Sequence, residues 1–335
     1  MDHQRRLTLS CLAATALPLA AQVPSPHAID IPKWFSNSLL DFRDEIPEAA
    51  RAGKRVMLYF GQDGCPYCKA LMKANFSGGP LTERVRRHYT AIAVNIWGDT
   101  EATWTDGRRF TEKTLARELK VQFTPTLIFF ETDGRIALRL DGYLPPERMT
   151  LVLDYLTQPR RDDSLADYLA ARQQAPALPV KTARPYLMRD PTSLQRRAGG
   201  KPLAVLFESA ACKACAEMHD EAFRRPEVLT QLRRFDVASV RSAELKSLVT
   251  PDGRRVEARH WARDLGVNLH PTVIFFDDQG REAFRFDGYL RPFHIESAFD
   301  YVASGAWKTE PQFQRFLQAR HDRLQAGGRR IDLWK

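Results

Sequence analysis

Four cysteines form two pairs with the spacing Cys-x-x-Cys, and these pairs are the residues best suited to chemistry. The first pair is Cys65 and Cys68, and the second is Cys212 and Cys215. Each pair follows a short apolar run and precedes a helical pattern, so each first cysteine is expected at a helix N-terminus, where partial positive charge stabilises a thiolate. A thiolate attacks a disulfide, and a second thiol resolves the mixed disulfide. The spacing therefore predicts thiol–disulfide exchange, with Cys65 and Cys212 as the attacking thiols.

The residues enclosed by the two pairs differ. Pro66 suits the first turn of a helix, because its missing N–H costs no hydrogen bond there, and Tyr67 follows it. The second pair encloses Lys213 and Ala214, and the Lys213 ammonium should favour the thiolate of Cys212. We therefore expect different reduction potentials at the two pairs, in an order that these residues alone do not set.

Two other interpretations of the cysteines remain open: one zinc ion held by all four thiolates, or two structural disulfides. Four-thiolate zinc sites have short spacings, whereas these pairs are separated by the length of a domain. A disulfide across so few residues constrains the unfolded chain little. We expect no metal and no cofactor other than the redox-active disulfides.

The two pairs belong to two copies of one domain. The chain has 335 residues, of which 44% are apolar and 27% charged, so about two domains with real cores are expected and a disordered chain is excluded. The segments 124–144 and 270–290 carry the same residue at most positions, including Asp-Gly-Tyr-Leu at their ends. A repeat this long indicates domain duplication, not a solenoid.

Each copy has the same predicted elements. Short runs rich in β-forming residues predict strands at 56–60, 91–96 and 126–130, and at 203–207, 237–240 and 272–276. Helical periodicity follows each cysteine pair and recurs at 112–120 and 151–156, and at 257–265 and 295–301. Asp-Gly and Gln-Gly predict hairpin turns at 133–134 and 279–280. The order predicts an α/β fold in each copy, with a mixed central sheet flanked by helices.

The expected domain organisation has five segments. They are a signal peptide at 1–21, a first domain at 30–157, a linker with a short helix at 158–190, a second domain at 191–306 and a C-terminal helical tail at 307–335.

The first residues have the pattern of a signal peptide. Arg5 and Arg6 precede the apolar stretch Leu7–Leu17, and small residues near Ala20 suit cleavage. The apolar stretch is shorter than the roughly 20 residues of a transmembrane helix. We expect a periplasmic or otherwise extracytoplasmic protein that does not span the membrane after cleavage. A buried N-terminal helix and a lipid-modified Cys11 remain alternatives.

Two prolines each open an apolar strand. Pro125 follows Thr124, and Pro271 follows His270. A proline there costs a hydrogen bond of the sheet, for which a cis peptide bond is one explanation and an ordinary trans proline at a strand start is another.

These features resemble the thioredoxin superfamily, present here as two tandem thioredoxin folds. Within it, residues of about 31–156 are similar to the SoxW-like thioredoxin-related group. The residues that carry this resemblance are Lys33-Trp34-Phe35, Gly64-Cys65-Pro66-Tyr67-Cys68, Asn95-Ile96-Trp97-Gly98-Asp99, Phe123-Thr124-Pro125-Thr126 and Gly142-Tyr143-Leu144. The second copy shares Gly288-Tyr289-Leu290 but lacks the Asn-Ile-Trp-Gly-Asp run.

The resemblance implies that both prolines are cis and face the cysteine pairs, with a glycine close by where a substrate chain approaches. The implied groove residues are Pro66, Tyr67, Thr124, Pro125 and Gly142 in the first copy, and Lys213, Ala214, His270, Pro271 and Gly288 in the second.

The sequence also departs from that family. Tyr59 and Leu206 stand six residues before the first cysteines, where ordinary thioredoxins carry a buried aspartate. His270 is either a positive or hydrogen-bonding imidazole that tunes Cys212, or an exposed bystander. Trp97 and Trp104 either shield the site or pack in the core.

The resemblance implies an exported thiol–disulfide oxidoreductase that reduces protein disulfides and is supplied by a membrane electron donor of the DsbD or CcdA type. The alternative is a client-binding, isomerase-like module in which only one cysteine pair is redox-active. The formal charge of +9 arises from basic residues spread along the chain, so we expect no nucleic-acid partner.

Overall fold

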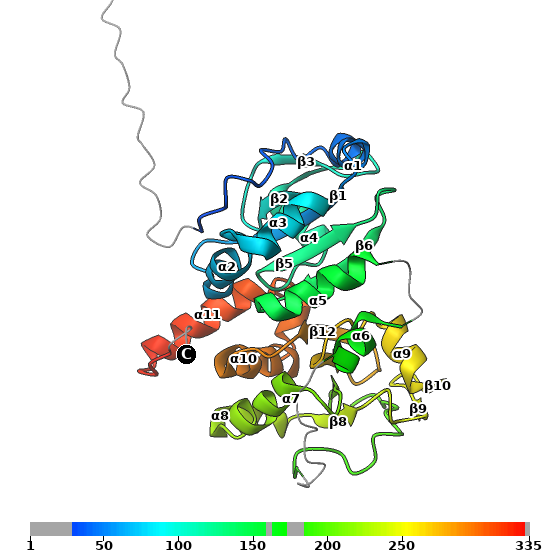
Figure 1. The fold of residues 1–335 in the computed structure, drawn as a ribbon. Helices are drawn as coiled ribbons and strands as arrows, with labels where there is room; N and C mark the ends of the chain where they lie inside the picture. Colours follow the sequence, from blue (N-terminus) through cyan, green and yellow to red (C-terminus); the bar gives the residue numbers. More distant parts are fainter. Residues whose placement is uncertain (1–28, 159–162, 173–183, 332–335) are drawn as a thin grey trace, which may run out of the picture.

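Two four-stranded sheets divide the chain into two domains, stacked one above the other in Figure 1. The computed structural model describes residues 29–158, 163–172 and 184–331. The predicted signal peptide at 1–21 lies outside the described residues. Each domain has a central sheet of parallel and antiparallel strands flanked by helices, which confirms the predicted α/β fold in two tandem copies.

Domain 1 carries its sheet in the order β2-β1-β5-β6, in which β1 pairs in parallel with β2 and antiparallel with β5. Its strands are β1 (Arg55–Gly61), β2 (Tyr89–Asn95), β3 (Glu101–Thr103), β4 (Arg109–Thr111), β5 (Thr126–Phe130) and β6 (Ile136–Asp141). Its helices are α1 (Phe42–Arg51), α2 (Pro66–Leu71), the π-type turn η1 (Met72–Phe76), α3 (Gly79–His88), α4 (Glu112–Glu118), α5 (Pro146–Thr157) and α6 (Leu165–Arg172).

Domain 2 repeats this arrangement with its sheet in the order β12-β11-β7-β8. Its strands are β7 (Leu203–Phe207), β8 (Asp236–Val240), β9 (Ser247–Val249), β10 (Arg255–Glu257), β11 (Thr272–Phe276) and β12 (Glu282–Asp287). Its helices are α7 (Lys213–Glu217), the π-type turn η2 (Met218–Ala222), α8 (Pro226–Leu232), α9 (Ala258–Asp264), α10 (Pro292–Ala303), the 3₁₀ turn η3 (Ala306–Lys308) and α11 (Phe313–Ala326).

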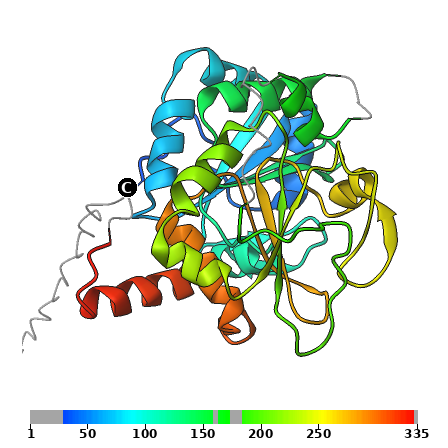
Figure 2. The same ribbon diagram turned by 90° about the horizontal axis from the view of Figure 1, so that it is seen from below.

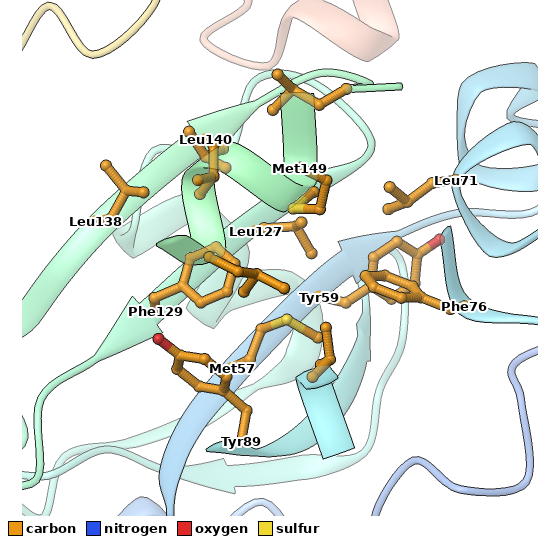
Figure 3. Packing of buried hydrophobic residues seen from close by; sticks show 14 of the residues in the cluster. Met57, Tyr59, Leu71, Phe76, Tyr89, Leu127, Phe129, Leu138, Leu140 and Met149 are labelled. Atoms are coloured by element: carbon orange, nitrogen blue, oxygen red, sulfur yellow. The ribbon is translucent and has the colours of Figure 1, made fainter. Parts of the chain in front are cut away.

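Each central sheet is covered on both faces. In β1, Met57 and Tyr59 join one hydrophobic cluster, whereas Leu58 and Phe60 join the cluster on the opposite face. Successive side chains of a strand point to opposite faces, so a strand buried on both sides is apolar throughout. Figure 3 shows the first cluster, where Leu127 and Phe129 of β5 pack beside Met57 and Tyr59.

Two short hairpins were not among the predicted elements. The strands β3 and β4 pair with each other, as do β9 and β10, and each has three residues. Such short, largely polar segments lack the apolar alternation that predicts a strand.

The ends of the predicted linker pack on different domains. Leu165 and Tyr168 of α6 are buried in the core of domain 1, against α5. In the described residues from 184 onward, Tyr186 and Leu187 pack on the core of domain 2, and Met188 N–H donates to Val237 O. The short helix α6 thus lies within the predicted linker, and the described residues of the linker pack on the two domains through their apolar side chains.

The predicted C-terminal tail is likewise part of domain 2. Phe313 of α11 is fully buried in its core, and the guanidinium of Arg320 forms ion pairs with Glu296 and Asp300 of α10 at 2.7 and 2.9 Å. Seen from below in Figure 2, α11 extends from the body of domain 2 along one side. The predicted C-terminal segment is therefore helical at α11, and the apolar stripe of this helix packs on domain 2.

The domains exchange one apolar side chain each. Phe123 of domain 1 packs in the core of domain 2, with ring centroids 5.1 Å from Phe313 and 5.5 Å from Phe284. Leu269 of domain 2 is buried in the core of domain 1. These two residues occupy equivalent places, each two positions before the proline that opens the third strand of its sheet. The exchange fixes the two domains face to face.

Replacing Phe123 with Ala should lower the free energy of unfolding by about 3–5 kcal/mol, since it removes a buried ring and leaves a cavity between domains. Thermal unfolding followed by circular dichroism measures the loss. Ile136→Ala is the matched control, because Ile136 is 50% exposed and its truncation should change stability by less than about 0.5 kcal/mol. Equal melting temperatures for the two variants would show that Phe123 does not join the domains.

Candidate active sites

The first site is built at the start of α2. Cys65 and Cys68 form a disulfide, and Cys65 is the N-cap residue of the helix, with its sulfur accepting the Cys68 N–H at 3.1 Å. Pro66 occupies the first turn of the helix, as the sequence predicts. The helix N-terminus thus points its free N–H groups at the sulfur that must carry negative charge when reduced.

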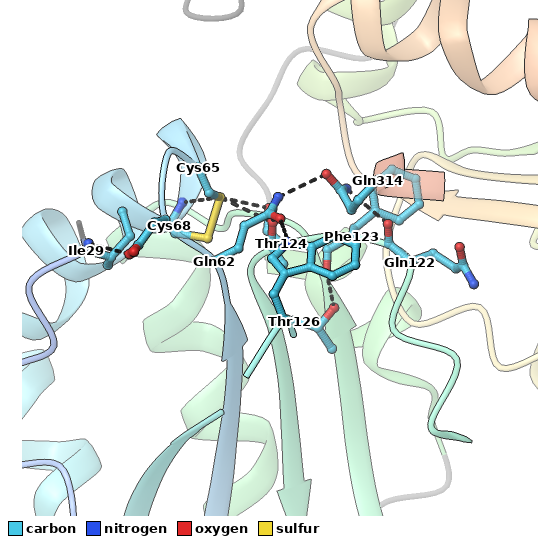
Figure 4. Close-up of a disulfide and its surroundings, with 11 residues drawn as sticks. Ile29, Gln62, Cys65, Cys68, Gln122, Phe123, Thr124, Thr126 and Gln314 are labelled. Carbon is cyan, nitrogen blue, oxygen red and sulfur yellow. Dashed lines mark hydrogen bonds between the residues drawn. A yellow bond between two sulfur atoms is a disulfide. The ribbon is translucent and has the colours of Figure 1, made fainter. Parts of the chain in front are cut away.

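The loop before β5 closes over this disulfide. The Thr124–Pro125 bond is cis, as the resemblance implied, and Thr124 Oγ1 lies 3.4 Å from Cys65 Sγ (Figure 4). Gly142 N–H donates to Pro125 O at 2.8 Å, and its φ of 95° favours glycine. The fold therefore brings the cysteines, the proline loop and Gly142 together.

Gln62 connects this loop to both domains and was not predicted. Its amide nitrogen donates to Thr124 Oγ1 at 3.1 Å and to Gln314 Oε1 of α11 at 3.0 Å, as Figure 4 shows. Its amide oxygen accepts the indole N–H of Trp97. No sequence signal marks a glutamine whose partners are so far apart along the chain.

The two tryptophans considered together in the sequence have different places. Trp97 lines the cleft at the first disulfide, with the guanidinium of Arg315 5.4 Å from its ring centroid. Trp104 packs against Phe42 and Phe130 in the core of domain 1. Only Trp97 therefore belongs to the site.

The second site repeats the first. Cys212 and Cys215 form a disulfide, and Cys212 Sγ accepts the Cys215 N–H at 3.1 Å as N-cap of α7. The bond before Pro271 is cis, and Gly288 N–H donates to Pro271 O at 2.7 Å. Between the cysteines, Ala214 is half-buried, whereas the Lys213 side chain is 82% exposed and forms an ion pair with Glu217 at 3.7 Å.

His270 differs from both simple expectations. It is buried rather than an exposed bystander, and burial lowers its pKa to about 4, so the ring is neutral rather than positive at neutral pH. Its backbone carbonyl faces Arg148 of domain 1, whose guanidinium approaches to 3.5 Å. A hydrogen-bonding role for the neutral imidazole remains a prediction.

A buried polar network lies next to the second pair and was also not predicted. His219, one helical turn after Cys215, shares a hydrogen bond of 2.6 Å with Glu208, which follows β7. Glu208 accepts from Ser239 at 2.5 Å, and the other ring nitrogen of His219 lies 2.7 Å from Tyr186 Oη. Burial raises the pKa of Glu208 to about 7, against the lowering effect of the Ser239 hydrogen bond.

Domain 1 has an apolar counterpart of this network. The equivalent positions, taken from the cysteine and strand alignment, are Gly61, Met72 and Ala93. The hydroxyl of Tyr59 occupies the space beside Gly61, where a Cβ would collide with it. The two sites therefore share the geometry of the cysteine pair. They differ in the buried residues behind it, which form a polar network only in domain 2.

Residues of domain 2 complete the first site. Arg291 N–H donates to Tyr67 Oη at 3.1 Å, and the ring of Tyr67 meets that of His294 edge-on at 5.7 Å between centroids. His294 is buried, which lowers its pKa to about 4. No sequence pattern places α10 at the first disulfide, since this contact joins two copies of the repeat.

The described residues contain no group of three or more His, Cys, Asp or Glu side chains that is placed to hold a metal ion. Among the helices of the described ranges, none has the length and apolar character needed to cross a membrane.

Comparison with known proteins identifies the family. A model of the thioredoxin-like domain matches residues 42–157 and again 195–303, which together make up more than half of the chain. With two such domains and a Cys-x-x-Cys disulfide in each, this is a thiol–disulfide oxidoreductase. The chain belongs to the thioredoxin-like domain family.

Several solved structures are similar to part of the chain. A thioredoxin-fold protein from Helicobacter pylori is 26% identical, with 35% of this chain and 76% of that chain covered and a TM-score of 0.30. A thioredoxin from Thermus thermophilus is 23% identical, with coverages of 35% and 83% and a TM-score of 0.28. The C-terminal domain of DsbD from Neisseria meningitidis is 17% identical, with coverages of 35% and 93% and a TM-score of 0.26. No curated protein matches the chain.

The raised pKa of Glu208 makes stability depend on pH. Its folded value of about 7 lies above the ordinary 4.5, so the folded state holds the proton more tightly, and this stabilisation is lost as the pH rises from 4.5 through 7. Wild-type protein should therefore lose more stability between pH 5 and pH 8 than Glu208→Gln, as measured by thermal unfolding.

Glu83→Gln is the control for this comparison, because Glu83 is an exposed glutamate with a side chain 60% accessible. Its pH profile should follow that of the wild type. If Glu208→Gln also kept the wild-type slope, the buried carboxyl would not be the titrating group.

Proposed function

We propose that this oxidoreductase is an exported reductase of protein disulfides. The observation that carries the proposal is the same constellation in both domains: a disulfide at a helix N-terminus, beside a cis-proline loop and a glycine. Cys65 and Cys212 are the cysteines that a substrate sulfur would meet, and each can form a disulfide with the second cysteine of its own pair. Attack and resolution then take place within one site.

The reductive reaction balances within each site. The thiolate of the first cysteine attacks the substrate disulfide, forms a mixed disulfide and releases one substrate thiol. The second cysteine attacks the sulfur of the first, releases the other substrate thiol and closes the protein disulfide. Two electrons and two protons pass to the substrate, so each turnover leaves the site oxidised.

A donor must therefore reduce each site again. We propose a membrane electron donor of the DsbD or CcdA type, and a periplasmic location in accord with the signal-peptide pattern of residues 1–21. Cysteine chemistry alone accounts for the reaction, so the proposal includes no cofactor. The SoxW-like resemblance of the first copy favours sulfur-oxidation carriers or cytochrome c maturation proteins as clients.

Cys68→Ser should accumulate mixed disulfides between Cys65 and client chains, since the resolving thiol is missing. The measurement is non-reducing electrophoresis of the variant after incubation with a periplasmic extract, followed by release with dithiothreitol. Cys65→Ser/Cys68→Ser is the matched control and should trap nothing at this site. A variant that traps no more than this control would contradict catalysis by the first pair.

Reduction potentials decide between two working sites and the isomerase-like alternative, in which only one pair is redox-active. Each pair is measured alone, in Cys212→Ser/Cys215→Ser and in Cys65→Ser/Cys68→Ser, by equilibration with glutathione buffers. For a reductase, both values should lie near about −270 mV, the potential of thioredoxin. A value near about −120 mV would indicate an oxidant, and a pair that never equilibrates would support the alternative.

A further inference from the structure

The first disulfide opens into a cleft that both domains build. The cleft has a volume of about 480 Å³, and its walls include Cys65 and Tyr67 of domain 1 together with Leu290 and Gln318 of domain 2. Cys65 itself is only 4% exposed. A substrate sulfur that attacks or is attacked at Cys65 must therefore occupy this cleft.

Helices α10 and α11 of domain 2 form one wall of the cleft, which we call its roof, and hydrogen bonds join this wall to domain 1. Gln314 of α11 accepts a hydrogen bond from Gln62, and the N–H of Arg291 donates to Tyr67 within the Cys-x-x-Cys motif. Next to the cis-proline loop, a Cβ at Gly142 would lie 3.6 Å from the backbone oxygen of Asp287. The side of the first disulfide that carries the groove residues is thus covered by the second domain.

The size of the cleft limits what can enter. Pockets of about 300–1,000 Å³ bury ligands of drug-like size, which corresponds to a few amino-acid residues. A folded protein presents its disulfide on a broad convex surface, which the roof formed by α10 and α11 would keep away from Cys65. A disulfide on a short or extended stretch of chain meets no such obstacle.

The chemistry of the walls indicates which residues flank the substrate cysteine. Beside polar and charged side chains, a group of aromatic and apolar ones lies on them, namely Tyr67, Trp97, Phe123, Tyr143, Tyr289 and Leu290. Such rings bind apolar and aromatic side chains by burying their surface. Among the polar lining residues, His294 has a pKa that burial lowers to about 4, so its ring is neutral, whereas Asp63 and Arg315 are charged residues of the lining.

We propose that the first site is selective for disulfides carried by short or extended peptide segments with apolar residues beside the cysteine, bound in the cleft between the two domains. The inference rests on the proposed reductase function and narrows the substrate of this site. The same chemistry occurs in a free peptide disulfide and in an unfolded protein chain. Electrons and protons pass as in the reductive reaction above, with Cys65 attacking and Cys68 resolving.

The test uses the full chain with the second pair silenced as Cys212→Ser/Cys215→Ser and the first pair reduced. Its oxidation rate is measured with three probes: a disulfide-linked dimer of the tripeptide Phe-Cys-Ala, an unfolded protein with one disulfide, and the same protein folded. We expect the folded protein to react about ten-fold or more slowly than the other two probes. Equal rates for folded and unfolded protein would overturn the proposal.

A matched pair of substitutions tests the cleft itself. Gln318 and Gln325 are both exposed residues of α11, but only Gln318 lines the cleft. Gln318→Trp should narrow it and slow oxidation by the tripeptide dimer about ten-fold, whereas Gln325→Trp should leave the rate unchanged. If both variants react at the wild-type rate, substrate does not pass through the cleft.

The remaining outcomes distinguish a free peptide disulfide from an unfolded protein chain as the substrate. They also distinguish a failure of the cleft proposal from a failure of the reductase proposal. Reaction with both the tripeptide dimer and the unfolded protein assigns the cleft to either source, and reaction with the unfolded protein alone assigns it to protein segments. As a folding control, Gln318→Trp in a Cys65→Ser/Cys68→Ser background should keep wild-type exchange at the second site. If neither site reacted with any disulfide, the reductase function itself would be contradicted.

Discussion

The structure depends above all on the reciprocal insertion of one apolar side chain from each domain into the core of the other. Phe123 and Leu269 are buried in the partner domain, and each stands immediately before the residue that precedes a cis proline. Because the proline loop lies beside the cysteine pair, burying its neighbour in the other domain also turns the groove toward that domain. The insertion of Phe123 into domain 2 therefore has two consequences: it stabilises the interface between the domains, and it places domain 2 over the first disulfide.

Face-to-face packing of a duplicated domain brings equivalent residues close together, including those of like charge. Asp141 and Asp287 end the edge strands β6 and β12, and burial together with the charge of Asp141 raises the pKa of Asp287 to about 6. Each carboxylate accepts a hydrogen bond from the first threonine of the neighbouring strand, at 2.6 Å from Thr126 and 2.5 Å from Thr272. These hydrogen bonds and nearby arginines offset a repulsion that the repeat itself creates.

Local sequence patterns were sufficient for the cysteine motifs and for the main strands and helices of each repeat. The spacing of Cys65 and Cys68, the apolar strands and the resemblance that implied cis bonds at Pro125 and Pro271 all concern local pattern. The contacts of Gln62 and His294 across the two domains escaped prediction, and so did the contact of the predicted C-terminal helix, α11, with the first site. These contacts join two repeats, and no periodicity within one copy encodes them. The packing of the segment between the two repeats was not predictable for the same physical reason, since an apolar residue such as Tyr186 is assigned to a core only when that core is known.

The two domains have the same geometry at the cysteine pair but differ in the buried side chains behind it. In domain 1, Tyr59 fills the space beside Gly61, whereas in domain 2 the smaller Leu206 leaves room for Glu208 and its bond to His219. A buried carboxyl that gains a proton near neutral pH changes the field around the second pair, and an apolar wall does not. Because reduction potential follows the relative stability of thiolate and disulfide, we expect the two sites to differ in potential through these buried residues as well as through their enclosed dipeptides. The two copies thus share the Cys-x-x-Cys disulfide at a helix N-terminus and differ in the buried groups behind it.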